Sequence, residues 1–345
     1  MKMTFRWYGS NDSIKLEYIK QIPNVTGVVS AIYDIPVGAV WPVDRIEELK
    51  EAVNSKGLEL EVIESVPVHE DIKLGRNNYK KYIENYKETI RNLSKCGIKT
   101  ICYNFMPVFD WTRTSIDHLL EDGSSTLVYY KNEIEKLDPT KLSLPGWDSS
   151  YSVDEVRQLI NDYKKLGEEG LWNNLSYFIN EIIPVAIEVG VNMAIHPDDP
   201  PWSIFGIPRI ITNEKNIDRF LNLNNSTNNG ITMCSGSLGC TRDNDVARLI
   251  RKYGEMKRIH FGHIRNVKIL EDGSFEESAH YTSCGSLDIV DIIKAYIEVG
   301  FEGHVRPDHG RMIWGEEGKA GYGLYDRGLG AMYIGGIYDA LKEKK

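Results

Sequence analysis

The sequence lacks several features that would assign it to common classes of protein. Its 345 residues contain no run of about 18 apolar residues, and the amino terminus MKMTFRWYGS lacks the apolar stretch of a secretory signal. The five cysteines are an odd number at irregular spacings, which does not fit a disulfide framework. We therefore expect a cytoplasmic protein with reduced thiols and no membrane partner.

Basic residues and nucleotide-binding motifs are also scarce. Lys and Arg number 41 against 50 Asp and Glu, and the net charge of -9 argues against a nucleic-acid partner. No glycine-rich loop precedes Lys-Ser or Lys-Thr, and no dinucleotide fingerprint follows a predicted strand. Reactions that depend on a nucleoside triphosphate or a dinucleotide are therefore not indicated.

Short apolar runs alternate along the chain with longer amphipathic stretches. This alternation is typical of repeated βα units, and a content of 41% hydrophobic and 26% charged residues is that of a globular protein with a large core. The pattern predicts an α/β fold, a (β/α)8 TIM barrel. Its eight predicted strands are Thr4–Trp7, Gly27–Ala31, Leu58–Ile63, Thr100–Asn104, Val191–His196, Ile231–Cys234, Arg258–His263 and His304–Asp308.

The segment between the fourth strand and its helix breaks this rhythm. Residues 105–171 are too many for an ordinary connection between a strand and a helix. They include a charged helical stretch around 153–165 but no obvious core of their own. We interpret residues 105–171 as a capping insertion over the barrel mouth, within a single domain of residues 1–345.

Four residues that can bind a metal end four successive predicted strands: His196, Cys234, His263 and Asp308. The carboxyl ends of barrel strands meet where TIM barrels keep their chemistry, so we expect these donors to converge. Zn²⁺ held by all four would be closed to substrate, whereas Mn²⁺ or Fe²⁺ keeps positions open, and the choice between these two stays open.

Other residues near these strand ends compete as metal ligands. His260 lies three residues before His263, and residues an odd number apart on a strand face opposite sides, so only one can point inward. We favour His263 because it is last on its strand. Asp198 and Asp199, in the loop after His196, are further rivals, although loop carboxylates are usually solvated.

Groups that can move protons or hold an anionic substrate lie close to the proposed ligands. His309 follows Asp308, and Tyr322 lies in a glycine-punctuated segment beyond it; we expect them to be the acid and base, with the pKa of the tyrosine lowered by nearby cations. Arginine forks can bind carboxylates, and polar groups at strand ends can bind hydroxyls. The predicted substrate-binding residues are Arg306, Arg265, Trp7 and Asn104.

The chain resembles the D-mannonate dehydratase family in seven segments: FRWYG, ESVPVHEDI, CYNFMPVFDWTRT, HPDDPPWSIFGIPRII, ITMCSGS, HFGHIR and RPDHG. The resemblance spans nearly the whole length. It implies a xylose-isomerase-like TIM barrel and a hydro-lyase of hexuronate (glucuronate) catabolism that converts D-mannonate to 2-keto-3-deoxy-D-gluconate with Mn²⁺ or Fe²⁺. It also implies a homodimer, the four metal ligands given above, and catalytic roles for His309 and Tyr322.

Two other functions fit the same scaffold. An aldose-ketose isomerase also uses a divalent metal. The metal ligands of such isomerases are generally rich in carboxylates, whereas this chain offers a thiolate as a ligand and arginines near the barrel mouth. A sugar-acid binding protein with a structural metal is not excluded by the fold. Formation of a 2-keto acid from mannonate distinguishes the dehydratase from both.

Overall fold

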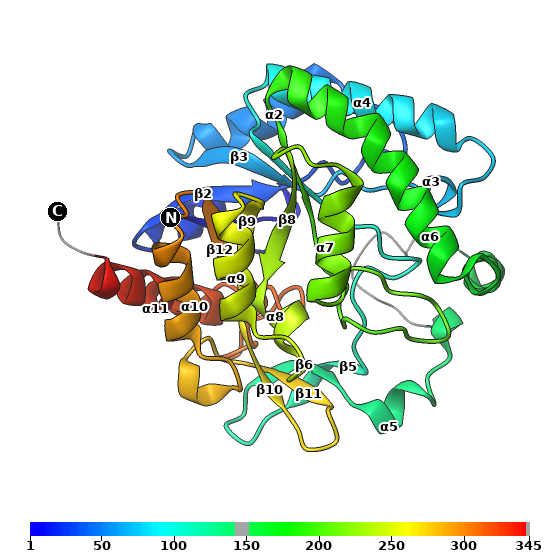
Figure 1. Ribbon diagram of the computed structural model, residues 1–345. Helices are drawn as coiled ribbons and strands as arrows, with labels where there is room; N and C mark the ends of the chain where they lie inside the picture. The colour runs from blue at the N-terminus through cyan, green and yellow to red at the C-terminus, as the bar shows by residue number, and fades with distance from the viewer. Residues whose placement is uncertain (142–151, 343–345) are drawn as a thin grey trace.

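The predicted strands close into a parallel barrel in the computed structural model, which describes residues 1–141 and 152–342 (Figure 1). The barrel order is β1-β12-β9-β8-β7-β4-β3-β2. Each observed strand overlaps a predicted one and ends within two residues of it, so the TIM-barrel prediction is confirmed. The strands are β1 (Lys2–Arg6), β2 (Val25–Ser30), β3 (Glu59–Glu64), β4 (Thr100–Tyr103), β7 (Asn192–Ile195), β8 (Asn229–Cys234), β9 (Ile259–Ile264) and β12 (His304–Pro307).

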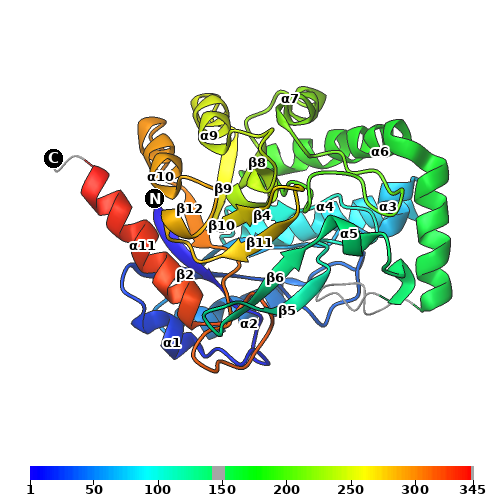
Figure 2. The same ribbon diagram turned by 90° about the horizontal axis from the view of Figure 1, so that it is seen from below.

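Helices surround the barrel and bury their apolar faces against it (Figures 1 and 2). In the second helix, for example, Ile46 and Val53 recur at helical spacing and are fully buried. The helices are α1 (Leu16–Gln21), α2 (Val43–Asn54), α3 (Glu70–Leu74), α4 (Tyr79–Lys95), α5 (Lys131–Ile134), α6 (Val153–Val189), α7 (Glu214–Leu223), α8 (Ser235–Gly239), α9 (Val246–Glu255), α10 (Ile289–Glu298) and α11 (Tyr325–Leu341). No helix of the described residues is long and apolar enough to cross a membrane.

A second, four-stranded sheet lies beside the barrel, in the order β10-β11-β6-β5. The strands β5 (Ser115–Leu119) and β6 (Ser125–Tyr129) come from the predicted insertion, whereas β10 (Asn266–Ile269) and β11 (Phe275–Ser278) form a hairpin directly after β9. Figure 1 shows this sheet next to the carboxyl end of β9. The hairpin was absent from the sequence prediction, because short strands with one exposed face give a weak pattern.

The additional sheet has a small hydrophobic core that several segments of the chain share. Its buried residues come from the insertion, from the hairpin and from the loops after β7 and β8: Tyr129, Ile134, Ile204, Cys240, Val267 and Phe275. No single segment supplies enough apolar residues to reveal this core in the sequence. Residues 142–151 of the predicted insertion lie outside the described residues, and its treatment as one unit within a single domain stays a prediction.

A small hydrophobic cluster inside the barrel reaches the cavity at its mouth. Val29, Val62, Cys102 and Phe261 form a cluster from β2, β3, β4 and β9, and Cys102 also lines the cavity above, so this cluster forms part of the cavity floor. All five cysteines are free, and four of them are buried, as expected for reduced thiols.

Candidate active site

A cavity of about 600 Å³ opens at the carboxyl ends of the barrel strands. Residues from the end of nearly every strand line it, including Arg6, Glu64, Asn104, His196 and Asp308. The predicted catalytic pair, His309 and Tyr322, also lines this cavity. The barrel therefore brings residues that are up to 316 positions apart (Arg6 and Tyr322) into one space at the expected end of the fold.

The four predicted metal ligands lie together at the cavity floor. The donor atoms of His196, Cys234 and His263 all lie within 4.8 Å of one another. Asp308 adjoins this group, with Oδ2 3.5 Å from Cys234 Sγ and Oδ1 3.9 Å from His263 Nδ1. His263 and Cys234 are fully buried, whereas His196 and Asp308 face the cavity.

The chemistry of these donors fits a divalent transition metal. His196 Nδ1 lies 2.7 Å from the carbonyl oxygen of Pro197, to which it donates, so its Nε2 lone pair points toward His263 Nδ1 at 3.1 Å. Two ligands about 2.1 Å from one ion and at right angles lie about 3 Å apart, as these nitrogens do. The facing lone pairs and the adjoining thiol and carboxylate are readily explained as ligands of one cation.

His309 and Tyr322 are in direct contact. His309 Nε2 lies 2.9 Å from the Tyr322 hydroxyl, and both side chains are buried. Burial, followed by the charge of Asp308, raises the pKa of Tyr322 to about 12, so the phenol is protonated at neutral pH. The expected lowering of this pKa by neighbouring cations is therefore wrong, because desolvation outweighs the nearby arginines.

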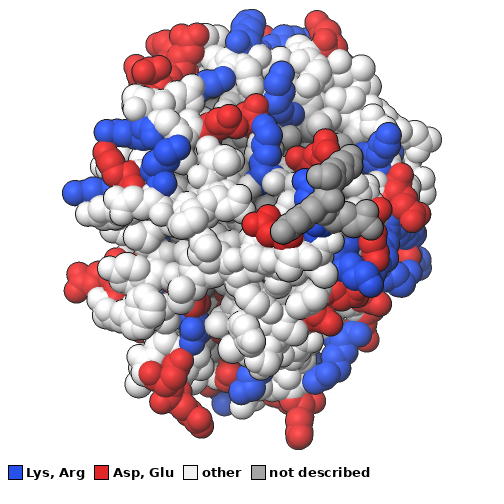
Figure 3. Space-filling model, turned by 90° about the vertical axis from the view of Figure 1, so that its left-hand side faces the viewer, with Lys and Arg blue, Asp and Glu red and all other residues white. Residues whose placement is uncertain are grey.

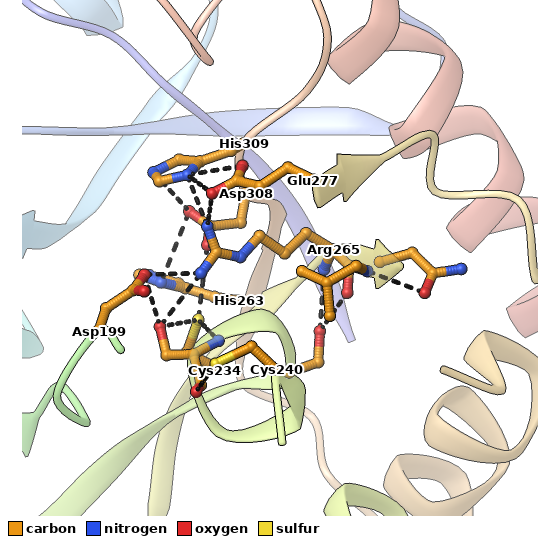
Figure 4. A network of polar contacts seen from close by, with 12 residues as sticks. Asp199, Cys234, Cys240, His263, Arg265, Glu277, Asp308 and His309 are labelled. Carbon is orange, nitrogen blue, oxygen red and sulfur yellow. Dashed lines mark hydrogen bonds and ion pairs between the residues drawn. The ribbon is translucent and has the colours of Figure 1, made fainter. Parts of the chain in front are cut away.

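Glu277, on β11, holds the other side of the His309 ring (Figure 4). Both carboxylate oxygens lie 2.9 Å from His309 Nδ1. Burial would raise the pKa of Glu277, but Arg265, His309 and Arg113 lower it to about 2, so the carboxylate accepts a hydrogen bond from Nδ1. Arg265 Nη1 lies 2.5 Å from the same nitrogen, so an arginine and a carboxylate both hold this edge of the ring, and Nε2 faces the Tyr322 hydroxyl.

Arg265 lies behind the cavity wall and does not line the cavity. Its guanidinium contacts Glu277 Oε1 at 2.7 Å, Asp199 Oδ2 at 2.6 Å and Asp308 Oδ2 at 3.3 Å (Figure 4). The guanidinium is fully buried and pairs with three carboxylates, and contact between Arg265 and the substrate stays a prediction. Arg265 positions the proposed ligand Asp308 and the carboxylate that orients His309.

Arg306 lines the cavity, but its donors are also engaged. Nε and Nη2 each lie 3.1 Å from an oxygen of Glu64, and Nη1 lies 2.7 Å from Asp308 Oδ1. Burial would raise the pKa of Glu64, but Arg306, His263 and Arg6 hold it well below its usual range. Contact between Arg306 and the substrate carboxylate stays a prediction, beside this observed role of holding Asp308.

The end of β1 contributes Arg6 and Tyr8 to the cavity lining. Trp7 packs in the hydrophobic core, whereas its neighbours Arg6 and Tyr8 line the cavity. Alternate residues of a strand face opposite sides, so Trp7 faces away from the cavity that its neighbours line, and its contact with substrate stays a prediction. Asn104 does line the cavity, where its Nδ2 donates to Asp110 Oδ1 at 3.0 Å.

The rival metal ligands have other partners. Asp198 accepts from the backbone N–H groups of Ile210 and Ile211 at 2.8 and 2.7 Å and pairs with Arg209. Asp199 pairs with two buried arginines, Arg113 at 2.8 Å and Arg265 at 2.6 Å. Both aspartates therefore hold the loop after β7 in place, and neither belongs to the group of donors that includes His263.

Comparison with known proteins decides the family. The family profile described as D-mannonate dehydratase (UxuA) matches residues 1–345. Mannonate dehydratase 2 of Halalkalibacterium halodurans is 57% identical over 343 residues, which are 99% of each chain. The chain belongs to the D-mannonate dehydratase family. Mannonate dehydratases of Streptococcus uberis and Oceanobacillus iheyensis are 56% and 53% identical, over 99% of this chain and 99% and 98% of theirs.

Solved structures agree with this membership of the D-mannonate dehydratase family. The crystal structure of mannonate dehydratase from Streptococcus suis serotype 2 is 49% identical, covers 99% of this chain and 95% of that chain, and superposes with a TM-score of 0.93. A D-psicose 3-epimerase from Clostridium cellulolyticum H10 covers 100% of both chains at 12% identity with a TM-score of 0.59, which shows a shared fold alone. The family and the fold predicted from the sequence are thus both confirmed.

Glu277 is the site residue that sequence reasoning missed in this member of the D-mannonate dehydratase family. It lies in a hairpin that was not predicted, next to a second glutamate, in the run Phe275–Ser278. The alternation of that strand, with Phe275 and Glu277 buried and Glu276 partly exposed, is the one signal that could have found it.

Proposed function

We propose that the protein is a cytoplasmic hydro-lyase that removes water from D-mannonate to give 2-keto-3-deoxy-D-gluconate. The observation that carries this proposal is the contact between His309 and Tyr322 beside four convergent metal donors, of which His196 and Asp308 line the same cavity. Elimination from a 2,3-dihydroxy acid needs one group that accepts the C2 proton and another that protonates the leaving C3 hydroxyl.

The raised pKa of Tyr322 favours one assignment of these two roles. In this assignment His309, whose Nδ1 is held by Glu277, accepts the C2 proton on Nε2. Tyr322, with its raised pKa, is the donor and gives its proton to the C3 hydroxyl, which leaves as water. The proton on Nε2 then passes to the tyrosinate over the 2.9 Å contact, and the enol tautomerises to the ketone.

His196, Cys234, His263 and Asp308 would hold Mn²⁺ or Fe²⁺ at the cavity floor. Such an ion supplies a Lewis acid that stabilises negative charge on the substrate carboxylate as the C2 proton leaves. Arg306 and Arg265 fix the Asp308 carboxylate from two sides at 2.7 and 3.3 Å. Donors that are held in this way lose little conformational freedom on binding a metal.

A 2-keto-acid assay tests the proposal. The purified protein should form a 2-keto acid from D-mannonate when Mn²⁺ or Fe²⁺ is present, and a chelator should abolish this activity. Neutral aldoses serve as the comparison substrates, because an isomerase would convert them and a dehydratase would not. Conversion of aldoses without formation of a 2-keto acid from mannonate would replace the proposal with the isomerase.

We also propose that the protein forms a homodimer through the face that carries α11. Figure 3 shows a broad area with few charged side chains on this side of the molecule. Exposed apolar side chains of this region include Trp314, Tyr325, Leu329 and Met332, the last three on α11. Tyr325, Leu329 and Met332 recur at three- and four-residue spacing on α11, and exposed apolar side chains on one helix face favour association. Light scattering of the wild type should give twice the mass of one chain. The Leu329→Glu variant should give a lower mass, because a charged side chain weakens the association.

A further inference from the structure

The cavity extends well beyond the proposed metal donors. Those donors come from β7, β8, β9 and β12, four successive strands of the barrel. The opposite half of the ring consists of β1, β2, β3 and β4, and the loops after β2 and β3 line the same cavity through residues such as Asp34, Val37 and His69. If C1 to C3 of the substrate lie at the metal donors, its remaining carbons lie in the half of the cavity formed by β1, β2, β3 and β4.

His69 presents a single hydrogen-bond donor to this part of the cavity. Its Nδ1 accepts from the backbone N–H of Asp71 at 3.0 Å, where His69 caps the amino terminus of α3. The ring proton is therefore on Nε2, which makes no hydrogen bond to any of the described residues although the side chain is only 22% exposed. Burial lowers the pKa of His69, which keeps the ring neutral at physiological pH.

The ring of His69 is also fixed in orientation. It stacks on Tyr82 with centroids 3.9 Å apart and an angle of 24°. Gly38, in the loop after β2, packs against both rings: a Cβ there would lie 2.6 Å from Tyr82 Cδ1 and 3.2 Å from His69 Cδ2, and its φ of +87° also favours glycine. An N–H group held in this way from three sides is suited to reading one hydroxyl of a ligand.

Asp34 and Asn104, which also line this half of the cavity, have partners within the protein. Asp34 pairs with Arg45 through both of its oxygens at 3.0 and 2.8 Å. Asn104 and Asp110 are hydrogen-bonded to each other at 3.0 Å. His69 thus differs from Asp34 and Asn104, because it lines the cavity and its Nε2 has no hydrogen-bond partner among the described residues.

We propose that the loops after β2 and β3 form the subsite for the distal hydroxyls of the sugar acid, and that His69 Nε2–H donates to one of them. This inference rests on the proposed function. His69 thereby acts in specificity: it favours a six-carbon acid over shorter acids with the same C2 and C3 configuration. The chemistry at C2 and C3 does not involve it.

Two substitutions separate the donor of His69 from its capping role. His69→Asn retains an oxygen that can accept from the N–H of Asp71 but is too short to reach the ligand space. His69→Gln places a terminal amide N–H near the original Nε2 position. Each variant is compared with the wild type for kcat/KM with D-mannonate and for inhibition by a four-carbon 2,3,4-trihydroxy acid of matching C2 and C3 configuration, with D-mannonate binding measured by calorimetry.

We expect weaker use of D-mannonate in His69→Asn, and no change in His69→Gln or in inhibition by the four-carbon acid. Loss of a neutral hydrogen bond should lower kcat/KM for D-mannonate about tenfold in His69→Asn, mainly through KM, while His69→Gln stays within about threefold of the wild type. Inhibition by the four-carbon acid should be unchanged in both. Equal losses for both ligands, or no loss in His69→Asn, would overturn the inference.

Failure of the proposed function gives a different result from failure of this inference. If the wild type binds D-mannonate in calorimetry but forms no 2-keto acid, the hydro-lyase proposal fails. The binding constants of the three proteins then decide the subsite: weaker binding of D-mannonate to His69→Asn, restored in His69→Gln, still supports it, and equal binding refutes it.

Discussion

Replacing Glu277 by glutamine tests how the buried charges hold the proton-transfer pair. The carboxylate contacts Arg113 Nη2 at 2.6 Å, Arg265 Nη1 at 2.7 Å and His309 Nδ1 at 2.9 Å, and it is almost fully buried. Glu277→Gln keeps the size of the side chain but removes the negative charge. Two buried guanidinium groups then face an amide, and Asp199 is the remaining carboxylate that pairs with both.

The pKa of Glu277 gives the size of the loss in free energy of unfolding that we expect for Glu277→Gln. Folding lowers the pKa of Glu277 from 4.5 to about 2, which corresponds to about 3 kcal/mol. Breaking a buried ion pair by removing one partner costs about 3 to 5 kcal/mol, in agreement. For a chain of 345 residues, this cost lowers the melting temperature by about 4 to 7 °C. Loss of a group that orients a catalytic side chain should reduce kcat by about 10- to 100-fold.

The pH dependence has a definite sign. Because the pKa of Glu277 is lower in the folded than in the unfolded protein, its stabilising contribution is present above pH 4.5 and is lost as the pH falls toward 2. The difference in melting temperature between the wild type and Glu277→Gln should therefore be largest near neutral pH and should narrow below pH 4.5.

Calorimetric melting and the rate of 2-keto-acid formation measure these effects. Glu276→Gln is the matched control, because this neighbour lies on the other face of β11, where it accepts from the Tyr130 hydroxyl at 2.9 Å. The control should melt within about 2 °C of the wild type and keep its kcat. If Glu277→Gln behaves like the control in both assays, the proposed orientation of His309 by this carboxylate is refuted.

Three further substitutions test separate parts of the site. Cys234→Ser should weaken metal binding, and unchanged metal content by elemental analysis would contradict the proposed ligand. His309→Ala should retain the metal but lose about 10²- to 10⁴-fold in kcat, so near-normal dehydration would remove it from the mechanism. Gly236→Ala should lower the melting temperature, because its Cβ would lie 1.8 Å from Arg265 Nε, and the same melting point as the wild type would show that Arg265 is not fixed there.

The barrel could be predicted from the sequence because its signals are local. Each strand is a short apolar run, and the glycines after helices at 57, 97, 190 and 300 adopt positive φ values of 71°, 77°, 69° and 64° as expected. The additional sheet could not be predicted in the same way. Its strands lie far apart in the sequence, β6 next to β11 for example, and their pairing depends on contacts that form only in the folded chain.

For the candidate site too, the positions of residues at strand ends could be predicted from the sequence, but their contacts with distant segments could not. The residues at strand ends, such as His196 and Asp308, could be proposed because strand geometry directs them to one place. The partners of the arginines could not, since strand periodicity says where a side chain points but not which carboxylate meets it. Arg265 illustrates this: its position at the end of β9 suggested a substrate contact, and its three carboxylate partners come from three other segments.

The carboxylate partners of Arg265 connect the proposed metal site with the proposed proton-transfer pair, His309 and Tyr322. Arg265 contacts the proposed metal ligand Asp308 through Nε and Glu277, the carboxylate that orients His309, through Nη1. A change at Cys234 should therefore affect metal content first, and a change at His309 should affect turnover alone, whereas Arg265→Met should reduce both. The additional sheet is thus part of the candidate active site, because β11 supplies Glu277, which contacts both His309 Nδ1 and Arg265 Nη1.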